Sequence, residues 1–135
     1  MNEDRLVMYI VIPRKLKLSI GKVGATCGHA VQLLTEVRER WIGEVYVNPR
    51  SEGMQEEGLL DTWVSWRKTD YGKIVLGASD VEFAEVRKLM EGDTACVTVV
   101  DIGLKEVAPG SVTAVGFWPM KKSAAPALIK NLKPL

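Results

Sequence analysis

The stretch GKVGATCGHA, residues 21–30, brings several chemically versatile side chains together. It contains the chain's single histidine, His29, together with Lys22 and Cys27. On a helix, with about 100° per residue, Lys22, Thr26 and His29 fall within one narrow sector. Because the amino terminus of a helix carries unpaired backbone N–H groups and a partial positive charge, it adds to the charge of the lysine. The pattern predicts a site for an anion or an oxyanion.

Other interpretations of this stretch stay open. Small residues on a helix beside a sheet are often only packing, and a lone histidine is more often part of the structure than a catalyst. Cys27 falls in the apolar stripe of the same helix, about a quarter turn from the polar sector. A hydrolase with Cys27 as its nucleophile would need a depressed thiol pKa and an exposed sulfur.

A second stretch, VVDIGLKEVAPGSVTAVG, covers residues 99–116. Asp101 stands at the carboxyl end of an apolar run and is followed by a glycine-containing loop, where ligands gather in α/β folds. There it can orient or deprotonate a histidine or a water molecule, or it can simply cap the turn. Ser111 and Thr113 alternate with Val112, so we expect their hydroxyl groups on one side of a strand.

The elements that must position these residues follow from apolar patterning. Four runs rich in β-branched side chains predict strands at residues 6–12, 73–78, 95–100 and 111–117, the first of them buried on both faces. Apolar residues spaced by three and four predict a helix over about 21–41, namely Val23, Cys27, Ala30, Leu34, Val37 and Trp41. Ser79 and Glu82 form a capping-box pair that opens a second helix, and Pro126 indicates a third near the end of the chain.

Strands that alternate with helices predict the α/β class, with a mixed four-stranded sheet. The segment at about 42–72 has turn residues and little periodicity, so we expect an extended loop followed by a short helix. A length of 135 residues fits a single domain, 1–135.

Charge and composition exclude several classes of protein. No apolar run approaches the roughly 20 residues of a membrane span, and acids near the amino terminus, where a secretory signal would be basic, favour a cytoplasmic protein. One histidine, two cysteines and no CxxC motif make zinc improbable, and we expect no metal or cofactor. A net charge of +1 excludes a strongly basic, histone-like nucleic-acid binder.

The basic residues nevertheless cluster near the two ends of the chain, at Arg14, Lys15, Lys17, Lys22, Lys105, Lys121, Lys122, Lys130 and Lys133. If the fold brought the termini together, these side chains would form a basic face suited to a polyanion. Scattered, solvated charge is the alternative interpretation.

These motifs together resemble the archaeal and eukaryotic type II peptidyl-tRNA hydrolases. GKVGATCGHA corresponds to the family's GK-x-A-A-Q-C-x-H-A, and DIGLKEVAPGSVTAVG to its D-A-G-x-T-Q-x-x-P-G-[ST]-x-T-x-x-G, with KIVL between them. The resemblance runs through nearly the whole chain. It implies a mixed four-stranded sheet with helices on both faces, a possible homodimer, and metal-free hydrolysis of the ester between a peptide and the terminal adenosine of a tRNA.

Carried over by position, the resemblance implies a catalytic site of Lys22, His29 and Asp101. The residues expected to contact the peptidyl-tRNA substrate are Lys17, Lys73, Lys105, Ser111 and Thr113. We hypothesise that His29, assisted by Asp101, activates water, while Lys22 and the helix amino terminus stabilise the oxyanion or hold a phosphate. Basic residues would bind the acceptor stem through its phosphates.

The chain departs from the family pattern at four positions that we expect to flank the site. Thr26 replaces a glutamine, Lys105 and Glu106 replace a Thr-Gln pair, and Trp118 replaces a glycine. The middle segment is also longer than the family usually has. The alternative function is therefore a divergent, inactive relative that serves as a binding or regulatory module, with Trp63, Trp66 and Trp118 at a protein interface.

Overall fold

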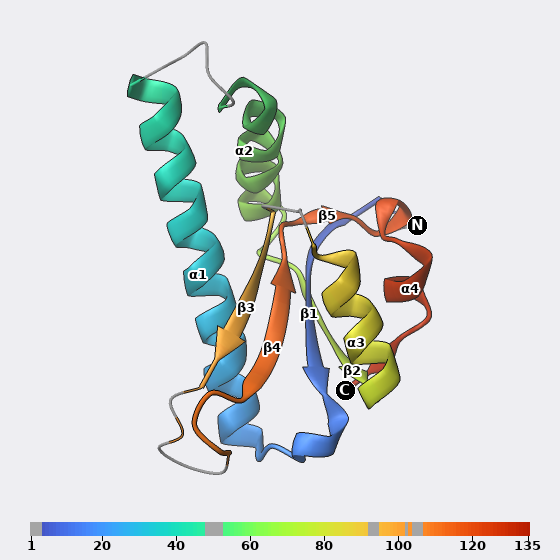
Figure 1. Ribbon diagram of the computed structural model, residues 1–135. Helices are drawn as coiled ribbons and strands as arrows, with labels where there is room; N and C mark the ends of the chain where they lie inside the picture. The colour runs from blue at the N-terminus through green and yellow to red at the C-terminus, as the bar shows by residue number, and fades with distance from the viewer. Residues whose placement is uncertain (1–3, 48–52, 92–94, 102, 104–106) are drawn as a thin grey trace.

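The computed structural model describes residues 4–47, 53–91, 95–101, 103 and 107–135 (Figure 1). In chain order the elements are β1 (Leu6–Pro13), the 3₁₀ turn η1 (Arg14–Leu16), α1 (Ile20–Val47), α2 (Gly53–Lys68), β2 (Lys73–Ala78), α3 (Asp80–Leu89), β3 (Cys96–Val100), β4 (Val112–Phe117), β5 (Met120–Lys121), the 3₁₀ turn η2 (Lys122–Ala124), α4 (Ala127–Lys130) and β6 (Lys133–Pro134). Within these residues, none of the helices is long and apolar enough to cross a membrane.

The sheet is mixed, as predicted, but it has six strands rather than four. The order is β3-β4-β1-β2-β6, with β5 paired to β1. β1 and β2 run parallel, whereas β4 is antiparallel to both β1 and β3. The two strands that the sequence did not predict, β5 and β6, have two residues each, which is too short for any alternation of apolar and polar residues to appear.

Helices cover both faces of the sheet, as Figure 1 shows. Strand β1 explains this arrangement. Its side chains point alternately to the two faces of the sheet, and every residue from Val7 to Pro13 is buried. Met8, Ile10 and Ile12 belong to one core cluster with residues of α1 and α2. Val7, Tyr9 and Val11 belong to a second cluster with α3 and α4. The prediction of a strand buried on both faces is therefore confirmed.

Helix α1 has 28 residues and extends beyond both ends of the predicted 21–41. Its predicted stripe faces the sheet: Ala30, Leu34, Val37 and Trp41 are buried, and Val23 and Cys27 are partly buried against the same core. Gly116 of β4 lies under this helix, since a Cβ built there would come within 3.2 Å of the Ala30 side chain. The close approach fixes the height of α1 above the sheet.

The middle segment is mostly helical, which corrects the prediction of an extended loop and a short helix. α1 continues to Val47, and α2 adds 16 residues, although residues 48–52 lie outside the described part. α2 packs Trp63 and Trp66 into the core beside Trp118, with ring centroids of Trp63 and Trp118 4.8 Å apart. The spacing of Leu59, Trp63 and Trp66 by four and three is the helical signal that this segment carries.

Candidate active site

The amino terminus of α1 and the residue that follows β3 meet at one end of the sheet, where β1 and β3 stop. There the Lys22 ammonium forms an ion pair with Asp101 Oδ2, and both side chains are largely removed from water, being 19% and 8% exposed. Ser19 opens the helix, because its Oγ accepts a hydrogen bond from the Lys22 N–H at 3.2 Å. The helix start thus holds both the backbone and the charge of Lys22 in place.

A tight turn holds Asp101 on the other side of this pair. Asp101 Oδ1 accepts a hydrogen bond from the Gly103 N–H at 2.6 Å, and the Asp101 N–H donates to the Ser111 carbonyl at 2.8 Å. Gly103 has a φ of 82°, which favours glycine. The hydrogen bond from Lys22, followed by that from Gly103, holds the pKa of Asp101 below its usual range, although burial opposes this shift. Asp101 is therefore a carboxylate at neutral pH.

His29 lies seven positions after Lys22 on the same side of α1, which corresponds to about 10 Å along the helix axis. Its side chain is exposed and lines a shallow hollow of about 290 Å³ with Gln32 of α1 and Val99 and Val100 of β3. Its charge adds a smaller contribution to the lowered pKa of Asp101. Among the described residues no hydrogen bond joins His29 to Asp101. Asp101 can therefore assist His29 only through a bridging group, such as a water molecule.

Thr26, the third member of the predicted polar sector, is buried rather than facing a ligand. Its hydroxyl forms a hydrogen bond with that of Thr113 on β4, and both side chains are almost fully buried. The pair lies between α1 and the sheet, one helical turn beyond Lys22. The structure therefore places the predicted substrate-binding hydroxyl of Thr113 beneath the site surface.

The other predicted substrate-binding residues divide between the two ends of the sheet. Ser111 is next to the ion pair, where its hydroxyl donates to the Ala108 carbonyl at 2.7 Å. Lys17, exposed in the connection to α1, lies at the same end. Lys73 opens β2 at the opposite end of the sheet, where its ammonium lies 5.2 Å from the Trp66 ring centroid. Lys105 lies outside the described residues.

The basic face expected from the two ends of the chain is divided in the same way. Arg14 donates to the carbonyls of Lys133 and Pro134 at 3.2 and 2.9 Å, so the last strand joins η1 at the end of the sheet where α1 begins, although β6 and β3 are the two outermost strands. Lys121, by contrast, pairs with Leu6 in β5, at the other end of β1. β5 and β6 attach to opposite ends of the sheet, so Lys121 and Lys133 lie at different ends of it, and one continuous basic face stays a prediction.

Comparison with known proteins identifies the family of this chain. A family model described as "Peptidyl-tRNA hydrolase PTH2" matches residues 6–135. The chain belongs to this peptidyl-tRNA hydrolase family. A curated protein of Methanococcus vannielii, named peptidyl-tRNA hydrolase, is 29% identical over 127 residues, which cover 92% of this chain and 94% of the relative. The similarity therefore extends over nearly the whole fold, including the elements that carry Lys22, His29 and Asp101.

Two of the alternatives drawn from the sequence lose their support: a protein interface formed by tryptophans, and a nucleophilic Cys27. Trp63, Trp66 and Trp118 are 4%, 2% and 2% exposed, so they form core rather than a protein interface. Trp118 does not flank the site either, because its indole N–H donates to the Leu59 carbonyl of α2 at 2.8 Å. Burial raises the pKa of the Cys27 thiol, only partly offset by the charge of Lys73, which opposes a nucleophilic role.

Two residues that shape the candidate site, and an exposed apolar neighbour, were not singled out in the sequence. Ser19 precedes the helix and Gly103 follows Asp101 by two positions, which are the patterns of an N-cap and of an aspartate-initiated turn. Ile20 is 94% exposed at the first position of α1, two positions before Lys22. No group of three His, Cys, Asp or Glu side chains suited to a metal ion occurs within the described residues.

Proposed function

We propose that this chain hydrolyses the ester bond between the peptide and the tRNA in peptidyl-tRNA, releasing free tRNA and peptide. The observation that carries the proposal is the Lys22–Asp101 ion pair at the amino terminus of α1, in a chain whose family is that of the peptidyl-tRNA hydrolases. An ammonium beside helix N–H groups suits the charge that develops on the carbonyl oxygen of an ester during hydrolysis.

In the proposed reaction Lys22 stabilises this oxyanion, and Asp101 positions the lysine. Asp101 is a poor base, since its pKa is lowered and both its oxygens already accept hydrogen bonds. We therefore assign the role of general base to His29, whose exposed ring can be reached by water in the hollow beside Val100.

The steps balance without a metal ion. The oxygen of a water molecule attacks the ester carbonyl carbon while His29 takes a proton from the water. The tetrahedral intermediate carries its negative charge next to Lys22. When it collapses, the bond from the carbon to the ribose oxygen breaks, and His29 returns the proton to that oxygen. The products are a tRNA with a free terminal ribose and a peptide with a carboxylic acid, which releases its proton to solvent and becomes a carboxylate.

The nucleic acid is bound mainly through its phosphates in this proposal. Lys17, exposed in the connection to α1, has the right charge, and Lys133 lies beside Arg14 at the same end of the sheet, on the outer strand opposite β3. Phosphate contacts make binding sensitive to salt and tolerant of sequence, as an enzyme for many tRNAs needs. Lys105 and Ser111 remain predicted substrate contacts, whereas the Thr113 hydroxyl is buried against Thr26 and Lys73 lies at the other end of β2. A homodimer and a cytoplasmic location also remain predictions.

The test is release of labelled peptide from diacetyl-lysyl-tRNA by the purified protein, with and without a chelator, beside free lysyl-tRNA as a control. Cleavage of the blocked substrate that survives the chelator is the expected result. A folded protein that binds tRNA without cleaving it would instead support the inactive binding module.

Variants separate the roles within the site. Asp101→Asn and His29→Ala should each lower kcat by at least about 100-fold, because the first removes the carboxylate that positions Lys22 and the second removes the proposed base. Gln32→Ala is the matched control for His29, since Gln32 lines the same hollow one turn further along α1. If His29→Ala turns over like Gln32→Ala, His29 is not the base and that assignment is refuted.

A further inference from the structure

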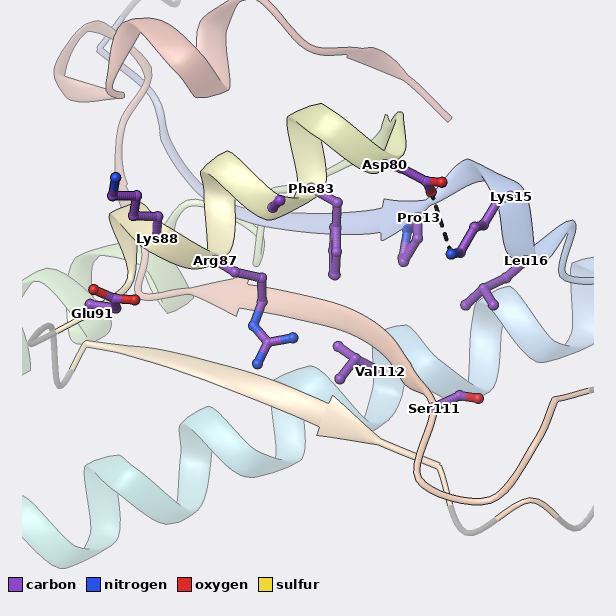
Figure 2. A pocket seen from close by; sticks show the side chains of 11 residues that line it. Pro13, Lys15, Leu16, Asp80, Phe83, Arg87, Lys88, Glu91, Ser111 and Val112 are labelled. Carbon is purple, nitrogen blue, oxygen red and sulfur yellow. Dashed lines mark ion pairs between the residues drawn. The ribbon is translucent and has the colours of Figure 1, made fainter.

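A second hollow lies on the face of the sheet opposite α1 (Figure 2). It has a volume of about 770 Å³ and is bounded by α3, by η1 and by the start of β4. Its apolar wall includes Leu16, Phe83 and Val112, while Arg87 and Lys88 of α3 supply positive charge. Figure 2 shows the Arg87 side chain reaching from α3 towards Val112, with the Phe83 ring beside it. We refer to this hollow as the α3 groove.

The positive charge of the α3 groove is available to a ligand. Arg87 and Lys88 have no ion-pair partner in the part of the chain that the structure describes. Lys15 pairs with Asp80 at 3.7 Å, but both side chains are about two-thirds exposed, at 68% and 66%, so this pair is weak. Glu91 is the other carboxylate in the lining. The groove therefore offers the Arg87 cation beside the Phe83 ring, while the Lys88 side chain lies at its margin and is directed away from both.

The α3 groove ends at the proposed active site. Ser111 lines its rim, and the Ser111 carbonyl accepts the hydrogen bond from the Asp101 N–H. Val112 and Thr113 are consecutive in β4, with Val112 lining the groove and Thr113 bonded to Thr26 of α1. A ligand in the groove would thus be separated from the ion pair only by the end of one strand.

We propose that the α3 groove binds the single-stranded 3′ end of the RNA, and this inference rests on the proposed function. A base stacks on Phe83, and backbone phosphates contact Arg87 and Lys88. Such a combination of an aromatic ring and cations is the usual means of holding single-stranded nucleic acid. The peptide part of the substrate varies between molecules, whereas phosphates and bases are always present at the RNA end. A fixed cation beside a ring therefore suits the RNA.

Binding of a short, fluorescently labelled oligoribonucleotide, followed by anisotropy at several salt concentrations, tests this inference without any turnover. Arg87→Gln should weaken binding about tenfold and reduce the slope of log K against log salt by about 0.7 for each phosphate that is no longer neutralised. Phe83→Leu keeps the apolar packing but removes the ring, and it should weaken binding at least about fivefold with little change in slope. Arg40→Gln is the charge-matched control, because Arg40 is exposed on α1, on the opposite face.

The proposal would be overturned if Arg87→Gln and Phe83→Leu bound the oligoribonucleotide with the same affinity as Arg40→Gln. Displacement of the RNA by a short acetylated peptide, with Phe83→Leu losing affinity for the peptide, would also overturn it. Hydrolysis gives an independent check: Arg87→Gln should raise KM for diacetyl-lysyl-tRNA and leave hydrolysis of the corresponding adenosine ester unchanged. If the wild-type protein hydrolyses neither ester, the proposed function fails, yet the binding data still decide whether the groove takes RNA.

Discussion

Replacing the buried hydroxyl pair, Thr26 and Thr113, one residue at a time should destabilise the protein more than replacing both. In Thr26→Val the hydroxyl of Thr113 keeps its place in the core but loses its partner. Both side chains are shielded from water, with 1% and 0% of their surface exposed, so no solvent replaces the lost hydrogen bond. In the double variant two valines of nearly the same shape face each other, and no polar group is stranded.

The magnitudes follow from the cost of an unsatisfied buried hydroxyl. Each single variant should lower the free energy of unfolding by about 1–3 kcal/mol. The double variant should lose less than about 1 kcal/mol, because replacing both partners by apolar groups of the same shape is nearly neutral. The coupling energy between the two positions is then more than about 1 kcal/mol, above the scatter of about 0.3–0.5 kcal/mol between independent sites.

Urea unfolding followed by the fluorescence of the four tryptophans measures these differences. Thr35→Val is the matched control, since the Thr35 hydroxyl donates to the Val31 carbonyl within α1 and that carbonyl keeps its helical role. This control should change stability by less than about 0.5 kcal/mol. Peptide release from diacetyl-lysyl-tRNA by the double variant then tells whether the hydroxyls also serve the reaction.

Additive single losses would refute this reasoning, because they would mean that the two hydroxyls do not depend on each other. A stable double variant with wild-type kcat would show that the pair only supports the site. A stable double variant with greatly reduced kcat would instead restore Thr113 as a substrate contact, as the family resemblance implied.

Three further predictions concern the stability and acid response of the site and its supports. Trp118→Phe should cost about 1–3 kcal/mol in urea unfolding, because the part-buried Leu59 carbonyl loses its donor, while kcat stays unchanged. Gly103→Ala should cost roughly 1–3 kcal/mol and lower kcat, since φ is 82° and the new Cβ would lie 2.5 Å from the Pro109 nitrogen. The lowered pKa of Asp101 means that its ion pair with Lys22 stabilises the protein above the unfolded pKa of about 3.9 and is lost as pH falls through the lower folded pKa. Unfolding of wild type and Asp101→Asn should accordingly differ above about pH 4 and converge below the folded pKa, and curves parallel at all pH values would contradict this.

The parts of the fold that are decided by neighbouring residues could be predicted from the sequence. The run LVMYIVI is apolar on both sides and becomes β1, and Ser79 and Glu82 form the predicted capping box at the start of α3. The stripe from Val23 to Trp41 becomes the buried face of α1. In each case periodicity or local hydrogen bonding carries the information.

The parts decided by contacts between distant residues could not be predicted in this way. β5 and β6 exist because β1 and β2 offer backbone partners, and their own two residues carry no pattern. Likewise, helical spacing placed Lys22, Thr26 and His29 in one sector. Only the packing of α1 against β3 and β4 leaves Lys22 half-buried, Thr26 buried and His29 exposed. Lys22 and Asp101 were expected in one site, whereas their direct ion pair depends on tertiary structure.

The departure from the family pattern at Trp118 is best understood together with the long middle segment. The Trp118 ring lies 4.9 Å from that of Trp41 on α1 and 4.8 Å from that of Trp63 on α2, measured between centroids. Its N–H satisfies the carbonyl of Leu59, also on α2. A glycine at 118 would leave α2 without this contact and α1 with a cavity. The tryptophan and α2 therefore pack as one unit, remote from Lys22 and Asp101, and the tryptophan gives no reason to doubt the substrate.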